Sequence, residues 1–233
     1  MKISKRIISL LMAALLVFGL PLSAFASDGG EIRISTAEDW KSFVKNCKLD
    51  TWSVGKTVVL DTDLDLGGNF TPVPVFSGTF DGNGHSIHMG SYTSAASDTG
   101  VFRYVSEGAV VKNLTVTGTW EPSGGKSTIG GIVGHNSGTI ENCMFNGVVD
   151  GKNNIGGIAG INENTGVITG CTVRGEIRGE HYTGGVAGQN LGSIIRCTNE
   201  SSVNTDGAEI APTLDDIDVS RINNTENISV YTN

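Results

Sequence analysis

The sequence predicts an all-β protein built as a parallel β-helix, or solenoid, of about 4–5 coils with a short N-terminal capping α-helix. Three observations predict this class: a Gly-Gly-x-x-Gly-x-Asn block recurs along the chain, short β-branched segments are separated by Gly and Asn, and 33 of the 233 residues are glycine. No 3.6-residue apolar period runs through a full repeat, which argues against a helical solenoid. The Leu-x-x-Leu-x-Leu frame of leucine-rich repeats is also absent.

The recurring block defines the coils, which start near residues 100, 130, 156 and 184. The last three copies begin 26 and 28 residues apart, whereas the copy at Gly100 is degenerate. Stacked coils place equivalent residues one strand spacing, about 4.8 Å, apart. The sequence therefore predicts ladders of amides, isoleucines and cysteines, made of Asn136, Asn162 and Asn190, of Ile140, Ile168 and Ile194, and of Cys143, Cys171 and Cys197.

The three ladder cysteines could be free thiols, form a disulfide or bind a metal. Leu114 takes the equivalent position in the degenerate copy, and a buried free thiol behaves as a small hydrophobe, so we predict free, inward-facing thiols. An even number of cysteines in an exported chain also permits a disulfide within the ladder, although parallel Cβ vectors would need distortion to form one. A metal site is a third alternative, disfavoured because no His shares the spacing.

The first residues predict export. Residues 1–26 have the form of a secretory signal peptide, with Lys2, Lys5 and Arg6 ahead of an apolar stretch and Ala24-Phe25-Ala26 as the cleavage site. The apolar stretch has 14 residues, fewer than the ~20 that span a bilayer. We therefore expect a secreted, extracellular or cell-surface protein with no membrane span after cleavage.

Residues 27–55 are predicted to form an N-terminal cap that covers the open end of the solenoid. Thr36 and Asp39 have the spacing of a capping box, with Asp in place of Glu or Gln. Trp40, Phe43 and Val44 follow at helical spacing, which predicts a short helix at about 37–47.

Residues 56–205 are predicted to form the β-helix itself. Val58, Leu60, Thr62, Leu64 and Leu66 alternate with polar residues, so we expect one half-buried strand over Lys56–Leu66. The Asp81-Gly82-Asn83-Gly84 segment predicts a turn between apolar runs. Beyond the repeats, residues 206–233 are predicted to be an irregular acidic tail or the start of a further coil.

The Phe-Ser-Gly-Thr-Phe-Asp-Gly-Asn-Gly-His segment at 76–85, followed by the Gly-Gly-Ile-x-Gly-x-Asn units, resembles GLUG-repeat proteins. These are secreted or surface-attached bacterial proteins, and some are peptidases of the IgA-cleaving type. The resemblance covers about 31–205 and implies a right-handed parallel β-helix in a bacterial surface context. It implies no activity, and the His-Glu-x-x-His zinc motif of the peptidases is absent.

No residue is assigned a catalytic, cofactor-binding or metal-binding role, and no cofactor is expected. Asp61, Asp63 and Asp65 resemble the start of a calcium loop, but Leu66 and Pro72 stand at positions that the EF-hand frame reserves for Gly and Glu, so a solvated strand face is favoured. Of the four histidines, His85, His88, His135 and His181, we interpret His135 as an outward surface residue because Ile161 and Gln189 replace it in other coils.

The outward row of Arg174, Glu176, Arg178 and Glu180 is the best candidate for an enzymatic face, with Tyr182 as the nearby aromatic residue. Charges that alternate in sign along a strand usually pair with each other, so we expect solubility rather than catalysis there. A carbohydrate-active β-helix enzyme, of the polysaccharide lyase or hydrolase type, remains an alternative.

The net charge of -8, without a long basic run, argues against nucleic acid as a partner. We expect a non-catalytic surface or extracellular module for adhesion or scaffolding, with a host or cell-surface glycan or protein as its partner. A second alternative is the N-terminal non-catalytic part of a larger surface protein, such as a peptidase. Self-association through an uncapped C-terminal coil is also expected, because an open coil end leaves strand edges unpaired.

Overall fold

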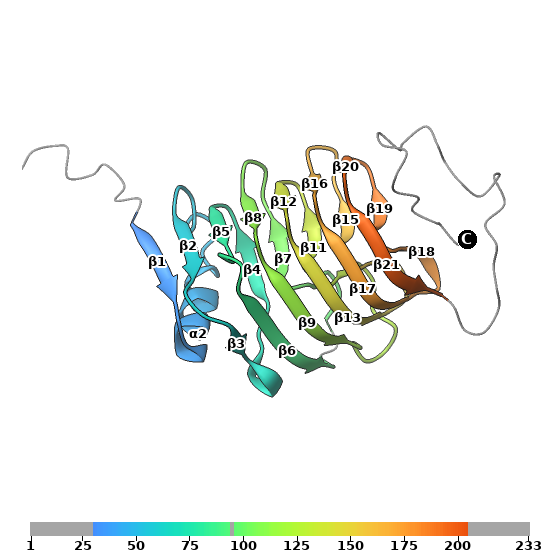
Figure 1. The fold of residues 1–233 in the computed structure, drawn as a ribbon, viewed down its shortest axis with the longest axis horizontal. Helices are drawn as coiled ribbons and strands as arrows, with labels where there is room; N and C mark the ends of the chain where they lie inside the picture. Colours follow the sequence, from blue (N-terminus) through green and yellow to red (C-terminus); the bar gives the residue numbers. More distant parts are fainter. Residues whose placement is uncertain (1–29, 94–95, 205–233) are drawn as a thin grey trace, which may run out of the picture. The chain divides into compact units, whose positions relative to one another are not determined.

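The computed structural model describes residues 30–93 and 96–204, whose strands form a parallel β-solenoid of about six turns (Figure 1). Strands of successive turns lie side by side, from β1 at the N-terminal end to β21 at the other end. The predicted signal peptide at 1–26 and the predicted tail at 206–233 lie outside the described residues.

Two long parallel sheets run along the stack. The seven-stranded sheet consists of β1 (Glu31–Ile34), β2 (Thr57–Leu60), β5 (Thr79–Asp81), β8 (Val110–Lys112), β12 (Thr139–Glu141), β16 (Val167–Thr169) and β20 (Ser193–Ile195). The six-stranded sheet consists of β3 (Leu64–Asp65), β6 (Ser86–Tyr92), β9 (Thr115–Trp120), β13 (Met144–Asp150), β17 (Thr172–Arg178) and β21 (Thr198–Val203).

Two shorter parallel sheets complete the coils. The five-stranded sheet consists of β4 (Val73–Phe76), β7 (Phe102–Val105), β11 (Val133–Asn136), β15 (Ala159–Asn162) and β19 (Ala187–Asn190). The three-stranded sheet consists of β10 (Ile129–Gly130), β14 (Asn153–Gly156) and β18 (His181–Gly184). A 3₁₀ turn, η2 (Gly67–Asn69), lies between β3 and β4.

The predicted ladders are present. The register pairs Ile140 with Ile168 and Ile168 with Ile194, and the same one-coil steps relate the three asparagines. The Asn136 amide donates from Nδ2 to Oδ1 of Asn162 at 2.8 Å, and Asn162 donates in the same way to Asn190 at 2.8 Å. Each buried amide therefore forms a hydrogen bond with the amide of the next coil, and this bond offsets the cost of burying a polar side chain.

The three-stranded sheet overlaps two coils of the five-stranded sheet. Strand β10 contacts β11 of its own coil and β15 of the following one, and β14 contacts β15 and β19 in the same way. A Cβ atom at Gly160 would lie 2.8 Å from the backbone nitrogen of Ile129, so the overlapping strand leaves no room for a side chain. The third glycine of the recurring block is thus required by a backbone that crosses over it.

The prediction of 4–5 coils was too low. Strands β2 and β3 form one turn ahead of the predicted repeats, and β4, β5 and β6 form another. These turns lack the Gly-Gly-x-x-Gly-x-Asn block, so the repeat pattern does not reveal them. Strand β1 adds a further rung that pairs with β2, within the segment predicted only as a cap.

The single strand predicted over Lys56–Leu66 is also wrong. Strand β2 ends at Leu60 and pairs with β5, whereas β3 begins at Leu64 and pairs with β6 in a different sheet. Asp61 and Asp63 therefore lie in the corner between two sheets, and Thr62 is exposed rather than buried. The buried alternation therefore stops at Leu60 and resumes at Leu64, on a strand of the other sheet.

The predicted helix is present as α2 (Ala37–Asn46), at the N-terminal end of the stack (Figure 1). The Thr36 hydroxyl accepts the Asp39 backbone N–H at 3.1 Å, and the Asp39 carboxylate accepts the Thr36 backbone N–H at 2.9 Å. This is the capping box that the sequence predicts. The buried face of α2 carries Trp40 and Phe43, and both rings contact Phe80 of the first full coils.

Replacing Thr183 by valine is expected to stabilise the protein by roughly 1 kcal/mol. The Thr183 hydroxyl is buried and has no hydrogen-bond partner within the described residues, while its register partner in β14 is the apolar Ile155. Valine keeps the shape and removes the unsatisfied donor. Chemical denaturation measures the gain. Thr165→Val is the control, because the Thr165 hydroxyl donates to the Ser137 carbonyl at 2.8 Å and its removal should bring no gain.

Candidate functional site on the outer face of the five-stranded sheet

One row of side chains on the five-stranded sheet reaches the surface. In register order these residues are Val75, Tyr104, His135, Ile161 and Gln189. The flanking strand residues are buried on β11, β15 and β19, whereas Pro74 on β4 and Arg103 on β7 are half-buried beside the row. The row therefore carries the side chains with which this sheet can contact a solute or partner.

His135 is held between two carboxylates. Its Nδ1 lies 2.9 Å from Oε1 of Glu163, and its Nε2 lies 3.2 Å from Oδ1 of Asp98. The imidazole stacks on Tyr104, with ring centroids 5.1 Å apart and an interplanar angle of 19°. The side chain of His135 is 23% exposed, and those of Asp98 and Glu163 are 36% and 33% exposed. We call these four residues the His135 cluster.

The backbone positions Asp98 for this contact. Asp98 has φ of 54°, in the left-handed region that Asp tolerates better than most residues. Its N–H donates to Ser127 at 3.0 Å, and its carbonyl accepts from Nε of Arg103 at 3.0 Å. Burial, followed by the nearby Asp98 carboxylate, raises the pKa of Tyr104, so the phenol stays protonated beside that charge.

The sequence-based interpretation of His135 as an outward residue captures its side of the sheet but not its partners. Glu163 is 28 residues away, about one repeat period, so the period could have indicated that neighbour. Asp98 lies ahead of the regular repeats, and no spacing in the sequence indicates its contact. The other histidines are dispersed: His85 lies 3.5 Å from Asp63, His88 contacts Thr117 at 2.9 Å, and His181 is exposed.

The outward charges of the six-stranded sheet pair with each other, as their alternation predicts. Arg174 binds Glu200 at 2.7 Å, and Arg178 binds both carboxylate oxygens of Glu176, at 2.8 and 2.5 Å. A longer pair, at 3.6 Å, joins Lys152 to Glu180. Arg178 also lies 3.6 Å from Asp150. These carboxylates are therefore engaged by neighbouring cations.

The three aspartates that resemble a calcium loop do not converge. Asp61 binds Arg33 at 2.6 Å, whereas Asp63 accepts the backbone N–H of Ser86 at 2.7 Å. Asp65 is exposed on β3. Across residues 30–93 and 96–204, no group of three or more His, Cys, Asp or Glu side chains is arranged to hold a metal ion.

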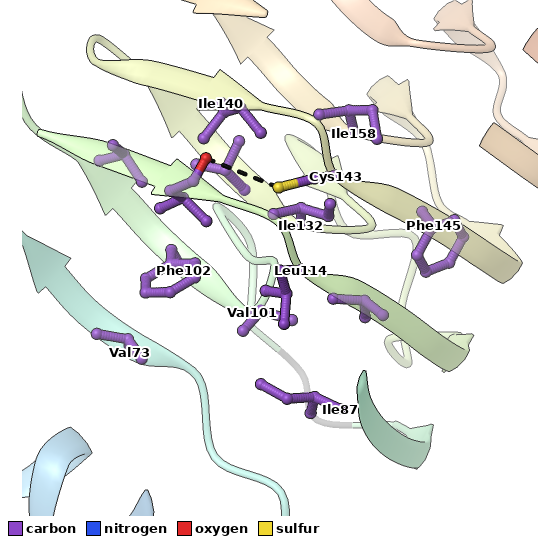
Figure 2. Packing of buried hydrophobic residues seen from close by; sticks show 14 of the residues in the cluster. Val73, Ile87, Val101, Phe102, Leu114, Ile132, Ile140, Cys143, Phe145 and Ile158 are labelled. Atoms are coloured by element: carbon purple, nitrogen blue, oxygen red, sulfur yellow. Dashed lines mark hydrogen bonds between the residues drawn. The ribbon is translucent and has the colours of Figure 1, made fainter. Parts of the chain in front are cut away.

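The cysteine ladder is buried, and its thiols are free. Figure 2 shows Cys143 packed among Leu114, Ile132 and Ile140, where its thiol donates to the Val111 carbonyl at 3.7 Å. The Cys143 backbone N–H donates to the sulfur of Cys171 at 3.4 Å. Cys171 and Cys197 repeat the thiol-to-carbonyl contact one coil further on each time. The ladder is therefore part of the core, as Leu114 predicts.

The buried thiols of Cys47, Cys171 and Cys197 are expected to lower the free energy of unfolding at alkaline pH. Burial raises the pKa of Cys47 to about 12. The side-chain hydrogen bond with the cysteine of the preceding coil, and burial as a further cause, raise the pKa of Cys171 and Cys197. Cys47, Cys171 and Cys197 stay protonated in the folded chain while unfolded thiols ionise near pH 8.5, so stability is full below about pH 8 and falls as the pH rises towards 12.

Denaturation at several pH values measures this loss, which reaches at most ~1.4 kcal/mol per pH unit for each thiol. Cys171→Ala is the matched variant, because it removes one ionising group from the middle of the ladder. Its stability should fall less steeply than that of the wild type above about pH 9. Equal slopes for the two proteins would show that the ladder thiols do not carry the effect.

Fold and surface together define a parallel β-solenoid built from short glycine-rich coils. Residues 125–150 and 151–178 match the family model described as the GLUG motif. Each match spans one complete coil, from β10 to β13 and from β14 to β17. The chain therefore contains GLUG repeats. The register extends the same coil to β18–β21, outside the matched residues.

The chain is also similar to halomucin of Haloquadratum walsbyi (strain DSM 16790 / HBSQ001). The two are 33% identical over 100 residues, which is 40% of this chain and 1% of halomucin. The chain thus spans a very small part of that relative. No solved structure matches it. In the described part of the chain, no helix has the length and apolar character needed to cross a membrane.

Proposed function

We propose that the chain is an exported bacterial module, secreted or held at the cell surface, whose β-solenoid serves adhesion or scaffolding and is not itself an enzyme. The observation that carries this proposal is the mutual pairing of the outward charges. General acid-base catalysis needs a carboxyl group that is free to exchange a proton with its substrate. Both oxygens of Glu176 are instead bound by Arg178, and Glu200 is bound by Arg174.

The outer surface is suited to a structural role because its ion pairs join neighbouring coils. Arg174 and Glu200 lie on adjacent strands, β17 and β21, as do Asp150 and Arg178 on β13 and β17. Such pairs contribute little individually when exposed, but they favour one register along the whole sheet. The similarity to a segment of halomucin supports an extracellular or surface location.

A second candidate is that the solenoid forms the non-catalytic part of a larger surface protein, such as a peptidase. The similarity favours this candidate because the matching segment is only 1% of halomucin. On this reading the ligand-binding or catalytic residues of the whole protein lie in other domains. The solenoid would then act as a spacer that sets the distance between them.

The proposal is tested by expressing the full chain in a bacterial host. We expect the product outside the cytoplasm with a mass that fits cleavage after Ala26. The purified product should bind cells, or immobilised glycans or proteins, saturably, and should release no new reducing ends from acidic polysaccharides. Retention of an uncleaved product in the cytoplasm would contradict export.

Glu176→Gln is the matched variant for the enzymatic alternative. If glycan cleavage occurs and this variant loses it, the charged face is an active site and the proposal is wrong. If the variant binds as the wild type does and neither protein cleaves, the outward charges serve the structure. Binding that is absent from both proteins on every surface tested would favour the spacer role instead.

A further inference from the structure

The His135 cluster contains a hydrogen-bond pattern that only one charge state of the ring completes. A neutral imidazole carries one N–H, so it donates to one acceptor and presents a lone pair at the other nitrogen. Both ring nitrogens of His135 face carboxylate oxygens, at 2.9 Å for Glu163 and 3.2 Å for Asp98. Both contacts are hydrogen bonds only when the ring carries two protons.

The cluster joins segments that are far apart in the sequence. His135 lies on β11, and Glu163 directly follows β15 in the next coil. Asp98 precedes Thr99, which bridges Ile129 of the three-stranded sheet. One imidazole therefore ties the segment at 96–99 to two successive coils of the five-stranded sheet.

The remaining groups around the ring do not replace either carboxylate. Tyr104 of β7 stacks on the ring face, and the guanidinium of Arg103 lies over Tyr104, 5.9 Å from its centroid. Arg103 binds the Asp98 carbonyl rather than its carboxylate. The register neighbour on β15 is the apolar Ile161. Among the residues that the structure describes, the charged and titratable groups that face His135 are thus Asp98, Glu163, Tyr104 and, behind Tyr104, Arg103.

We propose that His135 is a pH-responsive clamp, which joins Asp98 and Glu163 across the coils when its ring is doubly protonated and releases one of them when the ring is neutral. Release leaves an ionised carboxylate facing a ring lone pair, which is repulsive. The segment at 96–99 and the turn after β15 then become free to separate. This places a local, reversible opening on the outer face of the solenoid.

The direction of the effect follows from proton linkage. The folded chain offers the second ring proton two carboxylates, whereas the unfolded chain offers none at fixed distance. The two contacts therefore add stability when the ring carries two protons, and this stabilisation is lost when the ring gives one up. Imidazole side chains in general change charge between about pH 5 and 8, which sets the range of the test.

The test compares the thermal unfolding of the full chain and of His135→Gln between about pH 5.5 and 8. Glutamine is accommodated at this position of the coil, because Gln189 occupies it on β19. At the acidic end the wild type is expected to melt about 2–4 °C above the variant, and the difference should shrink at the alkaline end. Parallel curves across the range would overturn the proposal.

Two further variants separate the clamp from other titrations. Asp98→Asn combined with Glu163→Gln keeps the imidazole and removes both carboxylates, so it should lose the same pH-dependent increment as His135→Gln. Asparagine suits the left-handed backbone at position 98. His181→Gln removes an exposed histidine and should behave as the wild type. A pH dependence that survives the double substitution would contradict the clamp.

Amide hydrogen exchange measures opening at single residues, so it distinguishes a local change at the cluster from a change in the stability of the whole fold. The Glu163 N–H donates to Asn136 at 2.8 Å, and the Asp98 N–H donates to Ser127 at 3.0 Å. After correction for intrinsic exchange, both amides should be less protected at about pH 8 than at 5.5 in the wild type. In His135→Gln their protection should not change with pH. Equal pH dependence in both proteins would exclude a clamp at His135.

Discussion

Replacing Gly156 by alanine is expected to lower the free energy of unfolding by about 3 kcal/mol, at the upper end of the usual cost of overpacking. A Cβ at this position would meet the Ala159 carbonyl oxygen and would lie 2.7 Å from the Gly188 backbone nitrogen and 2.8 Å from the Ala187 Cα. All three atoms belong to backbone, so no side chain can rotate away. The methyl group would force the overlapping strands of two coils apart.

Urea denaturation of purified Gly156→Ala measures this loss. Gly68→Ala is the control, because a Cβ at Gly68 meets nothing within 4 Å and its backbone is not in the left-handed region. The control should remain within about 0.5 kcal/mol of the wild type, as surface substitutions usually do. If both variants lost the same stability, the close packing between coils would not be the cause.

Replacing Trp40 by alanine is expected to cost about 3–5 kcal/mol, the range for large aromatic residues truncated in a core. Trp40 is fully buried, and its ring contacts Phe43, Phe70 and Phe80 at centroid distances of 5.6, 6.1 and 6.4 Å. Its indole N–H donates to the Thr71 carbonyl at 3.2 Å. Truncation would leave a cavity between α2 and the first full coils.

Trp52→Ala is the matched control for this prediction. Trp52 lies 6.2 Å from Phe43 but is only partly buried, and Lys56 covers its ring at 5.6 Å. Its removal should cost clearly less than that of Trp40 in the same denaturation experiment. A smaller loss for Trp40→Ala than for Trp52→Ala would mean that α2 does not seal the core at this end.

The repeat period predicts the later coils well because it fixes the chemistry of each position. Asn136, Ile140 and Cys143 recur in the same order in the next two copies, with two extra residues between Asn162 and Ile168, and the one-coil register pairs the equivalent residues. The earlier turns are harder to predict. Their cores use large aromatic residues such as Phe76 and Phe80, which do not recur at a fixed period in the later coils. Strand β1 alternates visibly at Ile32 and Ile34, but four residues are too short a signal.

Contacts on the surface are likewise predictable where they follow the repeat period and unpredictable where they do not. The pairing of Arg174 and Arg178 with acidic neighbours was predictable, because it needs only alternation along a strand and stacking of equivalent positions. The His135 cluster was not predictable, since Asp98 comes from an irregular segment. Its approach depends on a left-handed backbone at one residue and on a neighbouring arginine that holds its carbonyl. Neither condition has a sequence period.

Because the three-stranded sheet overlaps two successive coils, it limits how the number of coils in a GLUG-type solenoid can change. Since β10 contacts β15 and β14 contacts β19, each of these strands packs against the following coil as well as its own. One coil therefore cannot unfold without breaking contacts of its neighbour. The cooperative unit is accordingly larger than the sequence repeat. A turn can gain a few residues without loss of register, as the two extra residues between Asn162 and Ile168 show, but a change within the strands preserves the contacts only when it comprises a whole period, such as 151–178. We therefore expect a solenoid of this kind to gain or lose whole coils. Under a pulling force it should unfold in blocks of several coils rather than one coil at a time.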